Sequence, residues 1–372
     1  MLSSEILAQA KALIADRVGL DFGESRLADF RRGLLRAFRA SSLPTPEAYL
    51  SWLAARPPAD PEWRRVAGHL TVGETYFFRD RPCFNVLERH VLSSIIAARR
   101  AEGVPRLRLW SAGCATGDEP YSLAILLDRL IPDRSEWTIT VLATDINVEA
   151  LEAARRGIYR EWSLRDTPEW ARRRYFRSVG GRGFQLDAEI MRMVTFAPLN
   201  LAADGYPSVV TDTGAMDVTL CRNVMMYFNR RTQRETAARL CRALAAGGWL
   251  VVSPAEASAE LFHPLVPVNF PGAILFHKTP GLDFPLSPPP HQTMGPDAAR
   301  SLEPARLPEP DPAHEMLRVG EPPAERSVPA RDNPPTLGQA RELADRGDLQ
   351  EARRLCLAAV TADRLDTEAY LL

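Results

Sequence analysis

The sequence is poor in the residues that build disulfides and metal sites. Its five cysteines, at positions 83, 114, 221, 241 and 356, are scattered, with no C-x-x-C pair and no histidine cluster near them. Isolated cysteines are typical of a reduced intracellular chain rather than of a disulfide-bonded secreted one. We therefore expect a cytoplasmic protein without a structural metal ion.

A membrane span and an excess of charge are absent as well. The first twenty residues form an amphipathic helical pattern broken by charges, and no apolar run approaches the roughly 20 residues that cross a bilayer. The formal net charge is -1, so the field of the whole molecule does not favour a polyanionic partner. We expect neither membrane insertion nor a nucleic-acid partner.

The chain also lacks the glycine-rich fingerprints of phosphate binding. Neither G-x-G-x-x-G nor G-x-x-x-x-G-K-[ST] occurs. Without these loops, no segment is marked to hold a pyrophosphate or a triphosphate on backbone N–H groups.

What remains is an ordinary globular composition with an alternating pattern. Residues 1–85 show helical spacing, whereas residues 86–280 alternate between strand and helix patterns, which is typical of a doubly wound α/β sheet. The glycines at 247 and 248 are expected to cap the last helix. The expected strands are 107–111, 138–144, 216–221, 249–253 and 273–278, and the expected helices between them are 120–130, 148–156 and 230–244.

Two further segments depart from this alternation. Between about residues 160 and 200, glycines at 180, 181 and 183 separate short strand patterns at 175–179 and 184–186, and another follows at 191–197. We expect a small antiparallel β-subdomain here. Proline then dominates residues 281–332, which predicts an extended linker.

The last forty residues, 333–372, resemble part of a tetratricopeptide repeat. Small and apolar residues recur at Ala340, Leu343, Gly347 and Ala352, although Arg364 stands where that family usually carries proline. One repeat does not bury its own face. We therefore favour a fragment of a longer repeat array, with helices that pack on another surface as the alternative.

The pattern richest in chemical information is the strand, loop and helix of residues 107–122. A strand pattern stops at a loop containing Gly113 and Gly117, and a helix opens with Asp118 and Glu119. Ligands of open α/β sheets bind at the carboxyl end of such a strand, although many glycine loops only connect elements.

An acid at the end of the second strand narrows the choice of ligand. Asp145 stands where a carboxylate accepts hydrogen bonds from ribose hydroxyls, and capping of the following helix explains this residue alone equally well. Asp118 and Glu119 in the first loop would repel a phosphate but suit the positive ammonium and sulfonium groups of S-adenosylmethionine. The residues therefore favour methyl transfer.

Together these motifs resemble one family. Residues 75–80, 110–122, 143–147, 199–201 and 221–228 are similar, in order and spacing, to the CheR family of chemotaxis receptor glutamate methyltransferases. The resemblance extends to about residue 278, roughly three quarters of the chain. It implies an N-terminal helical domain for receptor docking (1–85), a Rossmann-like methyltransferase sheet (86–280) with the β-subdomain, and, in a subset of members, a linker followed by tetratricopeptide repeats.

The resemblance also implies roles for individual residues. Arg79 and Tyr227 match the positions proposed to lie beside the transferred methyl group; a structural ion pair and a core phenol are the alternatives. Gly73 departs from the family pattern, because some members carry asparagine there and glycine has no side chain to contact the cofactor. The matching cofactor positions are Gly73, Thr75, Arg79, Glu119, Asp145, Asn200, Leu201, Arg222 and Asn223.

The implied reaction fits the residues that the chain lacks. A glutamate acceptor has an unperturbed pKa near 4.3 and is ionised at neutral pH, so its attack on a sulfonium methyl needs no general base. The products are a glutamyl methyl ester and S-adenosylhomocysteine. This protein-glutamate O-methyltransferase chemistry agrees with the absence of an evident catalytic histidine or cysteine.

A basic helix is the expected docking surface for the receptor. Its apolar residues recur at helical spacing, and its arginines are either a solvated face or a surface for the acidic helical region of methyl-accepting chemoreceptors.

The repeat tail is a second candidate for binding a protein partner. Two alternatives stay open: a methyltransferase for another acceptor, and a non-catalytic cofactor-binding scaffold that acts through its repeats. The arginines of the basic helix are Arg26, Arg31, Arg32, Arg36 and Arg39.

Overall fold

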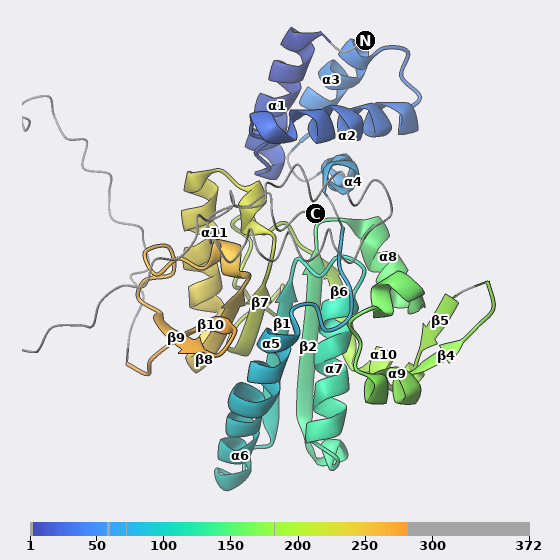
Figure 1. Cartoon of the computed structure of the whole chain (residues 1–372). Coiled ribbons are helices and arrows are strands. Elements are labelled where there is room, and N and C mark those ends of the chain that lie inside the picture. The colour runs from blue at the N-terminus through green and yellow to red at the C-terminus, as the bar shows by residue number, and fades with distance from the viewer. Residues whose placement is uncertain (1–2, 58–59, 72, 182, 282–372) are drawn as a thin grey trace, which may run out of the picture. The chain divides into compact units, whose positions relative to one another are not determined.

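Four α-helices form the N-terminal part of the protein, drawn in blue in Figure 1. The computed structural model describes residues 3–57, 60–71, 73–181 and 183–281. Three of these helices begin at a side-chain cap, where Ser3, Thr45 and Asp60 each accept a hydrogen bond from a backbone N–H of the first turn. The helices are α1 (Ser4–Val18), α2 (Leu27–Ala40), α3 (Pro46–Ala54) and α4 (Pro61–Leu70), and the 3-10 turn η1 (Glu24–Arg26) precedes α2.

Helix α2 is strongly amphipathic and packs closely on α4. Phe30, Leu34 and Ala37 are buried on one side of α2. Gly33 brings the two backbones together, since a Cβ at this position would lie 2.6 Å from the carbonyl oxygen of His69 on α4. The opposite side of α2 is exposed.

A mixed seven-stranded sheet forms the centre of the molecule, in the order β6-β2-β1-β7-β8-β10-β9. The five strands from β6 to β8 run parallel, and β10 and β9 continue the sheet antiparallel. The expected α/β sheet is therefore confirmed. Its strands are β1 (Arg106–Ala112), β2 (Thr138–Asp145), β6 (Val194–Pro198), β7 (Met216–Cys221), β8 (Leu244–Val252), β9 (Val266–Phe270) and β10 (Ala273–His277).

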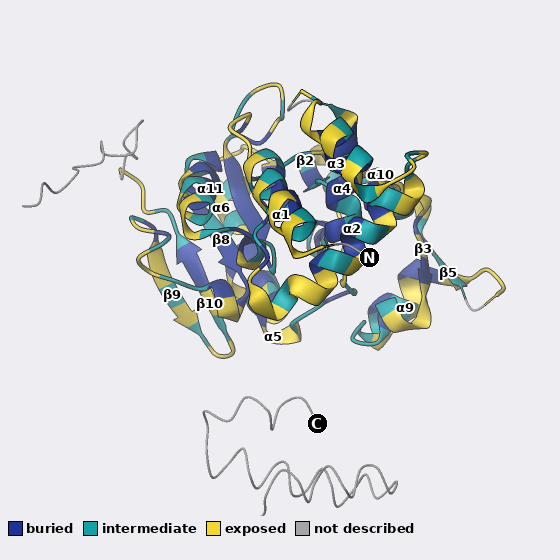
Figure 2. Cartoon of the chain, turned by 90° about the horizontal axis from the view of Figure 1, so that it is seen from above, coloured by how far each residue is buried: buried dark blue, intermediate teal, exposed yellow. Residues whose placement is uncertain are grey.

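Apolar side chains cover both faces of this sheet. Along β1, Leu107 and Leu109 pack with α6 and α7, whereas Trp110 and Ala112 belong to the cluster that contains α11 and the N-terminal helices. Figure 2 shows the buried residues concentrated in the strands. The helices around the sheet are α5 (Arg81–Val86), the π-helical turn η2 (Leu87–Leu92), α6 (Ser93–Ala101), α7 (Asp118–Leu130), α8 (Val148–Arg156) and α11 (Arg230–Ala243).

A small antiparallel sheet confirms the expected insertion in part. Its strands β3 (Ile158–Arg160), β5 (Gly183–Leu186) and β4 (Phe176–Ser178) pair in that order, beside α9 (Glu169–Tyr175) and α10 (Ala188–Arg192). The strand expected at 191–197 is not part of it. That segment is β6, which pairs parallel to β2 in the main sheet, because a strand pattern gives the period of a strand but not its partner.

The glycine pair after the last helix was also misassigned. Helix α11 ends at Ala243, and Gly247 and Gly248 lie inside β8. A Cβ on Gly248 would lie 2.8 Å from the carbonyl oxygen of Met216 on β7. The glycine therefore serves close pairing of two strands instead of a helix cap.

The linker expected at 281–332 and the repeat expected at 333–372 lie outside the described residues, apart from Gly281. Within the described segments, no helix has both the length and the apolar character needed to cross a membrane.

Replacing Gly33 by alanine should destabilise the protein even though alanine favours helices. Overpacking against the carbonyl oxygen of His69 costs about 1–3 kcal/mol, whereas helix propensity returns about 1 kcal/mol. We expect urea unfolding to show a net loss of up to about 2 kcal/mol. Gly23→Ala is the control, because nothing lies within 4 Å of its Cβ; equal stabilities for the two variants would contradict close packing of α2 on α4.

Candidate functional site

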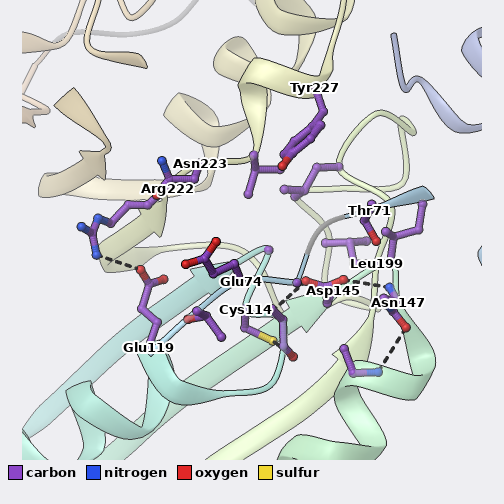
Figure 3. A pocket seen from close by; sticks show the side chains of 18 of the residues that line it. Thr71, Glu74, Cys114, Glu119, Asp145, Asn147, Leu199, Arg222, Asn223 and Tyr227 are labelled. Carbon is purple, nitrogen blue, oxygen red and sulfur yellow. Dashed lines mark hydrogen bonds and ion pairs between the residues drawn. The ribbon is translucent and has the colours of Figure 1, made fainter. Parts of the chain in front are cut away.

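A cavity opens where the carboxyl ends of β1, β2 and β7 meet the N-terminal helices (Figure 3). It encloses about 920 Å³ of empty space, its open mouth included, and it lies at the carboxyl ends of the strands, where ligands of open α/β sheets bind. Six separate stretches of chain line it, and they fall within residues 18–20, 71–79, 113–119, 145–150, 199–201 and 222–228.

The structure brings the proposed cofactor and catalytic residues together around this one cavity. They come from positions more than 150 residues apart in the sequence, and their assembly rests on the parallel strands that end at the same edge of the sheet. The lining residues among them are Gly73, Thr75, Arg79, Glu119, Asp145, Asn200, Leu201, Arg222, Asn223 and Tyr227.

A buried ion network forms one wall. Arg222, whose side chain is 4 % exposed, donates from Nη1 to Glu119 Oε2 (3.3 Å) and from Nη2 to Asp80 Oδ2 (3.1 Å). Its Nη1 also donates to the carbonyl oxygen of Arg79 (2.9 Å), and Ser111 Oγ donates to Glu119 Oε1 (2.8 Å). Two carboxylates share one guanidinium, so the network keeps one net negative charge beside the cavity.

Asp145 closes the carboxyl end of β2. Its two carboxylate oxygens accept hydrogen bonds from the backbone N–H groups of Ala115 and Asn147, both at 2.8 Å. Burial raises the pKa of Asp145. The helix-cap alternative for this residue is wrong, because the cap of α8 is Asn147, whose Oδ1 accepts from Ala150 N–H.

Arg79 lies on a sharply turned segment between the helical part and α5. The residues on either side of it, Phe78 and Asp80, both have positive φ, 56° and 68°. The Phe78 N–H is held by Ser122 Oγ at 2.9 Å, and Arg79 Nη1 donates to the carbonyl oxygen of Glu74 at 2.7 Å. Strained backbone of this kind persists where the surroundings fix it, and it concentrates at functional sites.

Tyr227 faces the same cavity from the 3-10 turn η5 (Met225–Tyr227) after β7. Burial raises the pKa of its phenol, while the positive charges of Arg26 and Arg79 oppose this shift. Arg79 therefore acts electrostatically on Tyr227, and Arg79 forms no ion pair within the described residues.

The remaining lining residues are held by backbone contacts. Asn200 Nδ2 donates to the carbonyl oxygen of Val18 on α1 (3.2 Å), which ties the loop after β6 to the helical part. Asn223 has a positive φ of 59° at the end of β7. Gly73 is exposed, and a Cβ there would meet Ala115 Cβ at 3.9 Å, so the position has room for a side chain.

Sequence reasoning missed the residue that holds the Tyr227 turn. Glu256 is buried and accepts hydrogen bonds from Asn223 N–H (2.6 Å), Met226 N–H (3.2 Å) and Ser253 Oγ (2.6 Å). Gln233 holds the same turn by donating to the carbonyl oxygens of Met225 and Phe228. Ser253 and Glu256 have the S-x-x-E spacing of a capping box, and this spacing was the available signal.

The arginines of the basic helix differ in their surroundings. Arg32 and Arg36 are exposed, the first paired with Asp29 and the second donating to the carbonyl oxygen of His69 (2.8 Å). Arg39 is exposed and Arg31 is half-buried. Arg26 differs from the exposed arginines, because its guanidinium lies over the Tyr227 ring.

Within the described residues, no group of three or more histidine, cysteine or acidic side chains is arranged to hold a metal ion. The four described cysteines are free and buried.

Asp118 predicts a measurable pH effect on stability. Burial raises the pKa of Asp118 from 3.8 to about 6, so between these values the folded state binds the extra proton. The favourable contribution is complete below the unfolded-state pKa and is lost as the pH rises through the folded-state pKa. Relative to Asp118→Asn, the wild type should lose about 2 kcal/mol of unfolding free energy between about pH 4.5 and pH 7.5. If the unfolding free energies of wild type and Asp118→Asn, measured by urea titration, changed in parallel with pH, the raised pKa of Asp118 would be contradicted.

Comparison with known proteins identifies relatives over most of the described chain. A chemotaxis protein methyltransferase of Escherichia coli is 34% identical over 264 residues, which cover 70% of this chain and 87% of that protein. A probable chemotaxis protein methyltransferase of Rhizobium etli is 36% identical over 215 residues (57% and 78%). The probable biofilm formation methyltransferase WspC of Pseudomonas aeruginosa is 31% identical over 259 residues (70% and 58%).

The part of the chain that matches a protein family contains the proposed cofactor residues of the cavity. The family described as "CheR methyltransferase, SAM binding domain" matches residues 73–264, a range that contains every proposed cofactor residue. The predicted cofactor, S-adenosylmethionine, is thereby confirmed for the matched domain. The chain belongs to the CheR methyltransferase family.

Proposed function

We propose that this protein transfers the methyl group of S-adenosylmethionine to glutamate side chains in the cytoplasmic helical region of methyl-accepting chemoreceptors. The products are glutamyl methyl esters and S-adenosylhomocysteine, as expected of a protein-glutamate O-methyltransferase. One observation carries the proposal: Arg79 and Tyr227 line the same cavity as Asp145 and the Glu119–Arg222 ion pair.

The residues of the cavity fit the methyl donor. The net negative charge of the Glu119–Arg222–Asp80 network suits an ammonium or sulfonium group. Each Asp145 oxygen accepts one backbone hydrogen bond, and a carboxylate oxygen can accept a second from a ribose hydroxyl. Thr71 lines the cavity, and its buried Oγ1 has no hydrogen-bond partner among the described residues.

The chemistry requires alignment more than acid–base catalysis. S-adenosylmethionine supplies a methyl group on a positively charged sulfur. A glutamate oxygen forms the new C–O bond as the C–S bond breaks. The electron pair of the C–S bond moves to sulfur, and no proton is transferred. Arg79 would hold the acceptor carboxylate and Tyr227 would orient it through its hydroxyl. Such positioning can lower the barrier by several kcal/mol, up to about 7–11 kcal/mol in well-oriented systems.

The exposed arginines of α2 supply a surface for an acidic acceptor. Arg32, Arg36 and Arg39 lie on the outer side of α2, and α2 starts directly after Arg26, which contacts Tyr227. An acidic helix bound along these arginines would therefore lie near the mouth of the cavity. Electrostatic contacts of this exposed kind act mainly on association and are weakened by salt.

Glu119→Gln should weaken the binding of S-adenosylmethionine about tenfold, since it removes the one carboxylate of the network that lines the cavity. Asp80→Asn is a matched control: it removes a carboxylate from the same guanidinium, but Asp80 does not line the cavity. We expect this control to change affinity less than about threefold. Calorimetric titration measures both, and equal losses would show that the affinity follows only the stability of the network.

The acceptor is tested with tritiated S-adenosylmethionine and receptor-enriched membranes. We expect a base-labile methyl ester on the receptor, and the triple variant Arg32→Ala, Arg36→Ala, Arg39→Ala should raise the KM for receptor about tenfold or more without changing cofactor affinity. Cofactor binding without transfer to any protein would favour the scaffold alternative. A base-stable product would point to another acceptor.

A further inference from the structure

The segment between α1 and α2 reaches the turn that carries Tyr227. Leu20 forms an isolated antiparallel bridge with Phe228. The Asp21 N–H donates to the carbonyl oxygen of Tyr227 at 2.7 Å. The helical part of the protein therefore takes part directly in building the transfer site.

Arg26 extends this contact from the backbone to the side chain. Its Nη2 donates to the carbonyl oxygens of Asp21 (2.7 Å) and Met226 (3.2 Å), one on each side of the junction. Its Cζ lies 4.9 Å from the centroid of the Tyr227 ring and 5.6 Å from that of Phe22. Both distances are within the range of a cation–π interaction.

Apolar core residues also pack against Tyr227, whereas the hydrogen bonds with Glu256 and Gln233 act on the backbone of this turn. Glu256 binds the N–H groups of Asn223 and Met226, and Gln233 binds two of the carbonyl oxygens. The guanidinium of Arg26, in contrast, contacts the ring of Tyr227 itself. The direction of the phenol toward the cavity thus depends on a residue outside the methyltransferase domain.

We propose that Arg26 is a positioning residue for Tyr227. By bridging Asp21 and Met226 and covering one face of the ring, it fixes the phenol at the cavity. Because Arg26 is the residue that precedes α2, it also joins α2, the helix that we propose for receptor docking, to the turn that carries Tyr227. This inference rests on the proposed function and separates Arg26 from the exposed arginines with which the sequence had grouped it.

The two roles differ in their kinetics. An arginine that only docks the acceptor affects its KM, whereas loss of a positioning contact lowers kcat. Misplacement of a reacting group by about 1 Å can cost about 100-fold in rate. We therefore expect Arg26→Met to lower kcat about 10- to 100-fold, with the KM for receptor and the affinity for S-adenosylmethionine within about twofold of wild type.

Two further variants, one conservative and one control, are measured alongside Arg26→Met. Arg26→Lys keeps the positive charge and should recover part of the lost rate. Arg65→Met is the control, since Arg65 is an exposed arginine that pairs with the buried carboxylate of Glu62 on α4, away from the cavity lining; it should match wild type in both constants. A loss of kcat with no recovery in Arg26→Lys, or a rise confined to the KM, would overturn the positioning role.

A double-mutant cycle with Tyr227→Phe separates positioning from general damage to the fold. If Arg26 acts through the Tyr227 hydroxyl, Arg26→Met should change kcat less than about twofold when Tyr227 is already phenylalanine. Equal fold-losses in both backgrounds would show that Arg26 acts on the fold and not through Tyr227.

One readout does not depend on activity. The ionisation of Tyr227 is isolated by subtracting the ultraviolet titration of Tyr227→Phe from that of the parent. The charged groups that face the phenol are Arg26, Arg79, Glu256 and Asp29, so removal of the Arg26 cation should raise the Tyr227 pKa. An unchanged pKa would overturn the inference. If wild type modifies no receptor but this shift is found, the proposed function fails and the contact stands.

Discussion

The ion network at Arg222 is the interaction on which the rest of the site depends. Its guanidinium lies at the end of β7 and binds Glu119 at the start of α7, together with Asp80 and the carbonyl oxygen of Arg79 on the segment before α5. Three stretches of chain are thereby held against one another. A buried arginine without its carboxylates would be very costly, so the folded state keeps Arg79 and Glu119 on the same cavity.

The helical part contributes to the cavity as well as covering it. Val18 accepts a hydrogen bond from Asn200, Leu20 bridges to Phe228, and Arg26 covers Tyr227. Helix α2, which carries the exposed arginines, is thus joined through Arg26 to the turn that carries Tyr227. In the function that we propose, acceptor docking and methyl transfer share this junction, and both the N-terminal helices and the sheet contribute to the reaction.

Much of the fold follows from local patterns. The expected helix at 148–156 and strand at 216–221 match α8 and β7 residue for residue, because helical spacing marks the first and alternation of apolar with polar residues marks the second. The strand at 191–197 was recognised, but its partner was not, since pairing is a long-range choice. Gly247 and Gly248 were read as a helix cap because glycine marks both helix ends and tight strand contacts.

The sequence by itself determined the family, the alternation of the sheet and ten of the residues around the cavity, since these depend on motif spacing and periodicity. Tertiary structure decided what the residues do to one another. The sequence grouped Arg26 with four other arginines of one helix, yet packing placed it over Tyr227, about 200 positions away in the chain. It also placed Glu256 beneath the Tyr227 turn. Such contacts depend on how distant segments pack, and local patterning carries no record of that packing.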